Sequence, residues 1–340
     1  MKRWIVKAGT TSLEGLTEQE AARPEPGRGE VRIKVHAVSL NARDQLLISG
    51  AYGVPNGDFI AIADGAGEID ALGSGVDGWS IGDRVTGLYF RDWHDGPPAQ
   101  DQGWGLGSDG QDGMLAEYVI LKADRIAAMP KSLSFEEAAC LPCAALTAWT
   151  ALNGDRPYRR PIGAADKVLV TGTGAVSLFA LLFAKARGAA VVATTSQEEK
   201  GRQVLELGAL DTVNYKQIPN WGEIAAERTG GFDRVVNAAG SAAIDQSIAA
   251  IAPGGDIALM GLYDHAATPP NFVGLMMKGG SIRGTAVGSA MAFADMAAFI
   301  DEHGIKPPIA RIFEMAETKA AYQFAASGEP FGKVVIRVAG

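Results

Sequence analysis

The hydrophobic positions along the chain follow two different patterns, which divide the chain into two parts. Up to about residue 120, apolar and polar residues alternate in short runs between glycine-rich turns. In residues 30–38 every second residue from Val31 to Ala37 is apolar, and the residues between them are polar. This alternation is typical of a strand with one buried face. The N-terminal part is therefore predicted to be mostly β-structure.

From about residue 167 the pattern changes to strands rich in β-branched residues that alternate with helical stretches. Successive strands begin roughly 20 to 25 residues apart, which is about the length that a strand, a helix and two short loops require, and parallel pairing needs such a crossover. The pattern predicts an α/β fold with a doubly wound parallel sheet of six strands. The strands are expected to begin near Val168, Val191, Thr212, Arg234, Asp256 and Ser281.

Two further segments complete this outline. Residues 332–338 are strongly β-forming, and we expect this last strand to return to the N-terminal part. Residues 91–112 are rich in glycine, proline and aspartate, which predicts a long surface loop.

A tight glycine turn follows the first of the six strands. Gly172 and Gly174 stand between this strand and an amphipathic helix, and Ser177 holds the third position of a G-x-G-x-x-G pattern. Gly172 permits the turn, Gly174 lets the backbone approach a pyrophosphate, and the N–H groups at the helix start favour negative charge. The motif alone is weak, but its place between a strand, a helix and a second strand predicts a dinucleotide site.

The end of the second strand indicates which dinucleotide is bound. An acidic residue there would bind the ribose of NAD and repel a 2'-phosphate. This chain has Thr195 and Ser196, with Lys200 one turn into the next helix, and these side chains can donate hydrogen bonds to a phosphate. NADP(H) is therefore favoured. The alternative, which leaves NAD(H) possible, is that Lys200 is a solvated charge and that Glu198 or Glu199 reaches the ribose.

Charge and composition exclude several other classes of protein. The chain has 31 Lys and Arg against 39 Asp and Glu, a net charge of -8, and such a surface repels nucleic acids and anionic lipids. Its longest apolar stretch is too short to cross a membrane, and we expect no secretory segment. Only Cys140 and Cys143 are present, too few for a disulfide framework. We therefore expect a cytoplasmic protein without a nucleic-acid or membrane partner.

Six short motifs are specific as a set in their order and spacing. They are SLNARD at residues 39–44, DGAGE at 64–68, GDRV at 82–85, LPCAALTAW at 141–149, TGTGAVS at 171–177 and FGK at 331–333. Through these motifs, nearly the whole chain resembles the zinc-free branch of the medium-chain dehydrogenase/reductase superfamily. That branch contains quinone oxidoreductases and related NADP-dependent alcohol dehydrogenases.

The resemblance implies two domains. Residues 1–143 and 286–340 would form a GroES-like, β-rich catalytic domain that is discontinuous in sequence, and residues 144–285 would form a Rossmann dinucleotide-binding domain. It also implies an active site in the cleft between them, a small-molecule substrate, and a homodimer formed through the edge of the Rossmann sheet.

The residues present also argue against a bound metal. In the zinc-dependent branch, a Cys, a His and a second Cys hold the catalytic metal. Here Asn41 stands at the position of the first Cys and Ala63 at that of the His, so that only Cys143 remains. One thiolate cannot form a tetrahedral site, and the segment 91–112 has no cysteines for a structural zinc. We therefore expect no metal.

Without a metal, the substrate must be polarised by hydrogen bonds and protonated by a side chain or water. The resemblance makes Tyr52 the first hydroxyl donor to the substrate oxygen and Asn41 a second donor, with Asp44 for orientation. The alternative is that Asp44 binds Arg43 or a backbone turn and that Tyr52 is a partly exposed loop residue.

The resemblance also carries over a set of cofactor contacts. Thr147 would approach the nicotinamide, Ala175 and Val176 the pyrophosphate, Tyr215 the adenosine phosphate and Lys333 the nicotinamide ribose. Four further residues, at the ends of the fourth and fifth strands, would lie at the carboxyl edge of the sheet, where ligands bind. They are Asn237, Gly240, Gly261 and Leu262.

Together these features predict a zinc-independent, NADP(H)-dependent oxidoreductase. It would transfer hydride between the nicotinamide and either an alcohol or ketone carbon or the β-carbon of an enone or quinone, and the sequence leaves these two chemistries open. The alternative class is a non-catalytic, crystallin-like or RNA-binding relative that keeps the cofactor fold. The acidic charge weighs against RNA.

Overall fold

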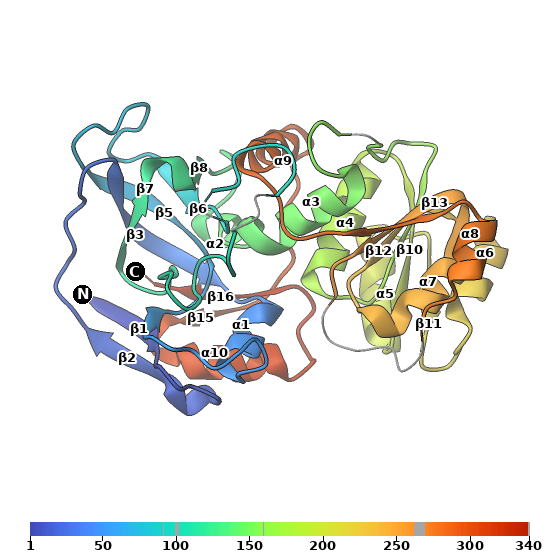
Figure 1. Ribbon diagram of the computed structural model, residues 1–340, viewed down its shortest axis with the longest axis horizontal. Helices are drawn as coiled ribbons and strands as arrows, with labels where there is room; N and C mark the ends of the chain where they lie inside the picture. The colour runs from blue at the N-terminus through green and yellow to red at the C-terminus, as the bar shows by residue number, and fades with distance from the viewer. Residues whose placement is uncertain (91, 99–101, 159, 262–268, 339–340) are drawn as a thin grey trace. The chain divides into compact units, whose positions relative to one another are not determined.

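The computed structural model describes residues 1–90, 92–98, 102–158, 160–261 and 269–338. The chain divides into two compact units. Met1–Leu146 and Gly288–Gly340 form the first unit, and Thr147–Val287 form the second. Each unit is built around a main β-sheet of its own (Figure 1).

The first unit contains a mostly antiparallel sheet, with seven strands among the described residues. Their order is β15-β16-β3-β5-β6-β8, and β7 also pairs with β3. The long strand β3 is central because it pairs with β5, β7 and β16. The strands are β3 (Glu30–Ser39), β5 (Asp64–Leu72), β6 (Arg84–Gly87), β7 (Tyr118–Lys122), β8 (Ile126–Ala128), β15 (Ile309–Glu314) and β16 (Lys333–Arg337).

The last strand completes this sheet, which confirms the prediction that it returns to the N-terminal part. β16 runs antiparallel to β3, with Val335 opposite Ser39, and β15 joins β16 in parallel. The backbone N–H of Leu40 donates to the carbonyl oxygen of Val334 at 2.9 Å. This pairing brings Lys333, the first residue of β16, to the end of β3.

A small sheet and several helices complete the first unit. The small sheet has the order β2-β1-β4, with β1 (Lys2–Val6), β2 (Leu16–Glu20) and β4 (Phe59–Ile60). The α-helices are α1 (Ala42–Ile48), α2 (Phe135–Ala138), α9 (Ala290–His303) and α10 (Thr318–Ala326). A turn of π-helix at Leu141–Ala145 follows α2.

The structure differs from the prediction that residues 91–112 form a surface loop. In its described part Trp93 and Leu106 are each only 4% exposed. The guanidinium of Arg43 donates to the carbonyl oxygen of Leu106 at 2.7 Å and to that of Trp104 at 3.0 Å. Part of this segment therefore packs into the first unit, because burying large apolar side chains is favourable and Arg43 satisfies the carbonyl groups that are buried with them.

The second unit contains a parallel sheet, with six strands among the described residues. Their order is β11-β10-β9-β12-β13-β14. This is the Rossmann arrangement, in which ligands bind at the carboxyl edge where the strand order reverses, here beside β9. The predicted fold class is therefore confirmed. The strands are β9 (Lys167–Val170), β10 (Ala190–Thr195), β11 (Asp211–Asn214), β12 (Phe232–Asn237), β13 (Ile251–Leu259) and β14 (Ser281–Gly284).

Helices connect these strands and cover the sheet. They are α3 (Leu146–Asn153), α4 (Ala175–Ala186), α5 (Glu198–Leu207), α6 (Trp221–Thr229), α7 (Ile244–Ala250) and α8 (Phe272–Met277). One buried cluster joins α6 and α7 to five strands of the sheet. It includes Trp221 and Ile248 of the helices and Leu169, Val192, Val213, Val235 and Ile257 of the strands. Within the described residues, none of the helices has both the length and the apolar content that a membrane crossing requires.

Candidate functional site

A cluster of polar side chains lies at the end of β3 in the first unit. Asn41 precedes α1, Asp64 is the first residue of β5, and Lys333 is the first residue of β16. Ser39, the last residue of β3, stands opposite Asp64 in one ladder and opposite Val335 in the other. The register of the sheet therefore brings the three side chains together.

The ammonium group of Lys333 is the centre of this cluster. Its Nζ donates to Asn41 Oδ1 at 2.5 Å and lies 3.5 Å from Asp64 Oδ2. The side chains of Lys333 and Asp64 are only 1% and 0% exposed. Asp64 Oδ2 also accepts a hydrogen bond from the backbone N–H of Cys143 at 3.3 Å. Because an isolated buried charge is very costly, each of the two charged groups needs the other.

Burial also changes the protonation of Asp64. It raises the pKa of Asp64 to about 6, while the ammonium of Lys333 acts in the opposite direction by favouring the carboxylate. Asp64 is therefore mainly ionised at neutral pH, and the pair carries a positive and a negative charge there.

Asp44 fixes the backbone at Asn41. Its Oδ2 accepts the N–H of Asn41 at 2.8 Å, and its Oδ1 lies 3.3 Å from a guanidinium nitrogen of Arg43. Burial raises the pKa of Asp44, and Arg43 opposes this rise. Asp44 therefore makes both contacts of the alternative considered from the sequence, to Arg43 and to a backbone turn. Its role in orienting a catalytic residue stays a prediction.

Tyr52 lies near this cluster, against the segment that Arg43 anchors. Its ring is 5.1 Å from the ring of Trp104, centre to centre. Burial raises the pKa of Tyr52, and the nearby guanidinium of Arg43 only partly offsets this rise. The hydroxyl group is therefore protonated at neutral pH and available as a donor.

Sequence reasoning did not assign a role to Arg43 or Asp64. Both are charged residues that the fold buries. Asp64 directly follows the apolar run FIAIA at residues 59–63. A charged residue in an otherwise apolar stretch is rarely buried without a partner. This pattern in the sequence could have indicated that Asp64 is buried and paired. The partner itself, Lys333, could be found only from the pairing of β3 with β16.

The glycine turn of the second unit follows β9. Gly172 has a φ of 76° and donates its N–H to Thr194 Oγ1 at 2.9 Å. Gly174 precedes α4, and a Cβ atom added there would meet nothing within 4 Å. Ala175 and Val176 form the partly exposed start of the helix. This backbone fits a pyrophosphate, because the first N–H groups of a helix have no partner within the helix and the approach is open.

The residues predicted to bind the adenosine phosphate lie around the end of β10. Thr195 Oγ1 donates to the carbonyl oxygen of Gln197 at 2.9 Å and accepts its N–H at 3.1 Å, so this hydroxyl shapes a turn. The N–H of Tyr215 donates to the carbonyl oxygen of Thr195 at 3.0 Å. Ser196 and Lys200 are both partly exposed. The structure thus brings Tyr215 beside Thr195.

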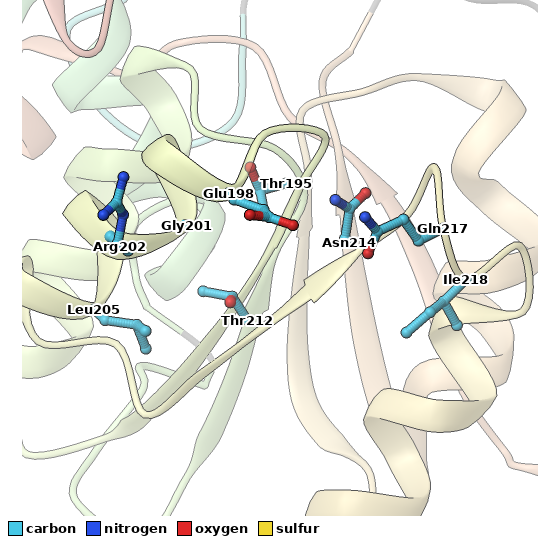
Figure 2. A pocket seen from close by; sticks show the side chains of 9 residues that line it. All are labelled: Thr195, Glu198, Gly201, Arg202, Leu205, Thr212, Asn214, Gln217 and Ile218. Carbon is cyan, nitrogen blue, oxygen red and sulfur yellow. The ribbon is translucent and has the colours of Figure 1, made fainter.

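A pocket of about 290 Å³ opens beside this strand end (Figure 2). Thr195, expected to help bind the 2'-phosphate of NADP(H), lines this pocket. So does Glu198, which would reach the ribose of NAD(H) in the alternative. The other lining residues come from α5, β11 and the chain after β11, and they are Gly201, Arg202, Leu205, Thr212, Asn214, Gln217 and Ile218.

Asn237 holds the loop after β12. Its Nδ2 donates to the carbonyl oxygen of Gly240 at 3.1 Å, and its Oδ1 accepts the N–H of Gly240 at 3.0 Å. A Cβ atom at Gly261 would lie 2.2 Å from the backbone nitrogen of Gly240, so the two loops touch only because this residue is glycine. Thr147 is buried in the first turn of α3. Leu262 lies outside the described residues.

The side chains at the three positions that would hold zinc do not fit that metal. Asn41 already accepts a hydrogen bond from an ammonium group, and Ala63 has no donor atom. Burial raises the pKa of Cys143 strongly, so its thiol is protonated and is a poor ligand. Among the residues that the structure describes, no group of three or more His, Cys, Asp or Glu side chains could hold a metal ion.

Known proteins share this architecture over the whole chain. Residues 27–131 match the alcohol dehydrogenase GroES-like domain, and residues 175–302 match the zinc-binding dehydrogenase family. A zinc-type alcohol dehydrogenase-like protein of Schizosaccharomyces pombe is 36% identical, with 99% of each chain covered. The chain belongs to the medium-chain dehydrogenase/reductase superfamily.

Two further members of this superfamily indicate its range of chemistry. A quinone oxidoreductase of Pseudomonas aeruginosa is 28% identical, with 99% of each chain covered. An NAD-dependent alcohol dehydrogenase of known crystal structure has 31% sequence identity to this chain. The two structures align over 100% of both chains with a TM-score of 0.86. This chain is therefore an oxidoreductase of the alcohol dehydrogenase type.

The raised pKa of Asp64 predicts a specific dependence of stability on pH. A carboxyl group whose pKa is higher in the folded than in the unfolded state binds more protons when folded, so its contribution to stability is lost as pH rises from about 4 to about 6. Unfolding in denaturant is the measurement. Relative to Asp64→Asn, the natural protein should lose on the order of 3 kcal/mol across this range. A constant difference between the two proteins would contradict the assignment.

Proposed function

We propose that this chain is a zinc-independent, NADP(H)-dependent oxidoreductase. It transfers hydride between the nicotinamide and a small-molecule alcohol or ketone, or the β-carbon of an enone or quinone. The hydrogen bond between Lys333 Nζ and Asn41 Oδ1, at 2.5 Å, is the observation that supports the absence of a catalytic metal ion. Asn41 stands at the first of the three positions that hold zinc in the zinc-dependent branch. The ammonium group hydrogen-bonded to it would repel a metal cation.

The second unit would hold the cofactor. The turn at Gly172 and Gly174 and the N–H groups at the start of α4 suit its pyrophosphate, while Asn237 shapes the loop at the carboxyl edge through Gly240. When bound, the nicotinamide supplies or accepts the hydride.

The residues of the first unit would polarise the substrate. Tyr52 is the first donor to the substrate oxygen, since its raised pKa keeps the hydroxyl protonated at neutral pH. Asn41 is the second donor, and Asp44 orients it through the hydrogen bond to its backbone N–H. Two donors aimed at one oxygen stabilise the negative charge that develops there during hydride transfer.

The activity can be tested directly with purified protein. Oxidation of NADPH by quinones and enones, and reduction of NADP⁺ by secondary alcohols, should reveal turnover in at least one series. Tyr52→Phe should lower kcat about 100-fold in the active series, because it removes one donor to the developing charge. Absence of turnover in both series would refute the proposed function, and full activity in Tyr52→Phe would refute the role of the hydroxyl alone.

The preference for NADP(H) is proposed from the residues after β10. Ser196 and Lys200 would bind the 2'-phosphate together with Tyr215, next to Thr195. Lys200→Ala should raise the KM for NADPH roughly 10-fold or more, as expected for the loss of a charge-assisted hydrogen bond, and leave that for NADH unchanged. Lys122→Ala, at an exposed lysine of β7 in the other unit, is the matched control. If Glu198 binds the ribose instead, Glu198→Ala will raise the KM for NADH and Lys200→Ala will change neither value.

We also propose a cytoplasmic homodimer. β14 is the last strand of its sheet in the described chain, so one edge is open for pairing with a second copy. Next to it, α8 exposes apolar side chains, including Met276 at 75% and Met277 at 82%. A two-fold axis through this edge would cover both features. Both cysteines are free thiols, as a reducing compartment would keep them.

Sedimentation tests the dimer. The natural protein should sediment at twice the mass of one chain, and Met276→Lys with Met277→Lys should shift it toward the monomer because charges would be buried at the interface. Lys substitutions at the exposed Ile81 and Val54 of the first unit serve as the control and should leave the mass unchanged. A monomeric natural protein would exclude the proposed interface.

A further inference from the structure

The side-chain amide of Asn41 can face its neighbours in two ways, and Lys333 selects one of them. An ammonium group donates hydrogen bonds and accepts none. The atom of Asn41 that it contacts at 2.5 Å is therefore the oxygen, Oδ1, and not the nitrogen. The N–H groups on Nδ2 are consequently directed away from Lys333.

The nitrogen of this amide is left without a partner. Among the described residues, Asn41 Nδ2 is buried and makes no hydrogen bond, and Asp64 Oδ1 is in the same state. The amide of Asn41 is nevertheless close enough to Asp64 to lower the pKa of that carboxyl group. Nδ2 carries two N–H groups, so at least one of them remains for a ligand. Leaving a buried donor unpaired costs about 1 to 3 kcal/mol, and a ligand oxygen placed at Nδ2 would recover that cost.

We propose that Lys333 is a positioning residue for the reaction. With Asp64 as its counter-charge, it fixes the amide of Asn41 so that Nδ2 donates to the substrate oxygen. This inference rests on the proposed function, in which Asn41 is the second donor. It gives Lys333 a task within the first unit, in place of the contact with the nicotinamide ribose expected from the sequence.

The backbone around Lys333 is built to hold it in one place. Gly332 has a φ of 109°, and a Cβ atom there would lie 2.2 Å from the carbonyl oxygen of Pro308. The N–H of Lys333 donates to that same carbonyl oxygen at 2.8 Å. The chain thus enters β16 through a conformation that only glycine adopts easily, and the position of the ammonium group follows from it.

Asp64 is the counter-charge of Lys333. Its Oδ2 lies 3.5 Å from Nζ of Lys333, so the carboxylate attracts the ammonium group and holds it beside Oδ1 of Asn41. Several other charged or titratable groups face Asp64 and contribute to its field. They are Arg43, Asp44, Tyr89, Cys140 and Cys143.

Kinetics of three variants test the proposal. Lys333→Met, of similar volume, should lower kcat about 10- to 100-fold, since a misplaced donor loses its effect in the transition state. The dissociation constant for NADPH should stay within about twofold. Lys333→Arg, which also only donates, should recover part of kcat. Lys306→Met, at a lysine of the same unit whose side chain is 53% exposed, should behave as the natural protein.

The outcomes separate the possible failures. If the natural protein is inactive in the substrate screen, the proposed function fails. If the natural protein is active and Lys333→Met retains its kcat, the positioning role is refuted. If instead Lys333→Met weakens NADPH binding and leaves kcat unchanged, Lys333 is a cofactor ligand and the positioning role is again refuted.

A measurement that needs no turnover addresses the same contact. In the NMR spectrum of protein labelled with ¹⁵N at asparagine, the side-chain amide signal of Asn41 is identified by its absence from the spectrum of Asn41→Ser. We expect this signal to shift in Lys333→Met and to titrate with a midpoint near pH 6 in the natural protein, but not in Asp64→Asn. Circular dichroism of each variant verifies folding. An Asn41 signal that is the same in Lys333→Met and the natural protein would overturn the inference.

Discussion

The positions of the polar side chains at the end of β3 depend on a buried ion pair between Lys333 and Asp64. Both side chains are essentially inaccessible to solvent. Removing either charge from water is so unfavourable that the fold must supply the other, along with hydrogen bonds for the remaining polar atoms. Asn41 and the backbone N–H of Cys143 supply two of these hydrogen bonds. This requirement ties the last strand of the chain to the first long strand and fixes the side chains at their common end.

A second constraint governs the Rossmann unit, and it acts through backbone geometry instead of charge. Gly172 takes a positive φ, and Gly174 leaves open space where a side chain would lie. The start of α4 is therefore accessible to a phosphate. The loop after β12 is held by the amide of Asn237, whose hydrogen bonds are used within the protein. Its contribution to a cofactor site is thus to shape the backbone around Gly240.

The strands could be predicted from the sequence because their signal is local. The six starts between Val168 and Ser281 each fall within or next to a strand of the parallel sheet, since β-branched runs and their spacing are properties of short segments. The existence of β16 followed from the same reasoning, while its membership in the first sheet is what the resemblance implied. The burial of Trp93 and Leu106 did not, because glycine and proline content describes turns and says nothing of what a loop packs against.

The partners within the candidate site could not be predicted from the sequence. Lys333 and Asp64 are 269 residues apart, and their contact depends on the registers of two separate ladders with β3. Sequence patterns specify which face of a strand is buried but not which side chains meet at its end. The roles of Asn41, Asp44 and Tyr52 came from resemblance, and the structure adds the contacts through which Asp44 and Lys333 could orient Asn41.

We propose that a lysine-centred cluster, and not a metal ion, organises the candidate catalytic residues of this oxidoreductase. The most direct test is to measure metal content and turnover on the same sample after treatment with a strong chelator. We expect zinc far below one equivalent per chain, with kcat unchanged by the chelator. Loss of activity on chelation, restored by one equivalent of zinc, would contradict it.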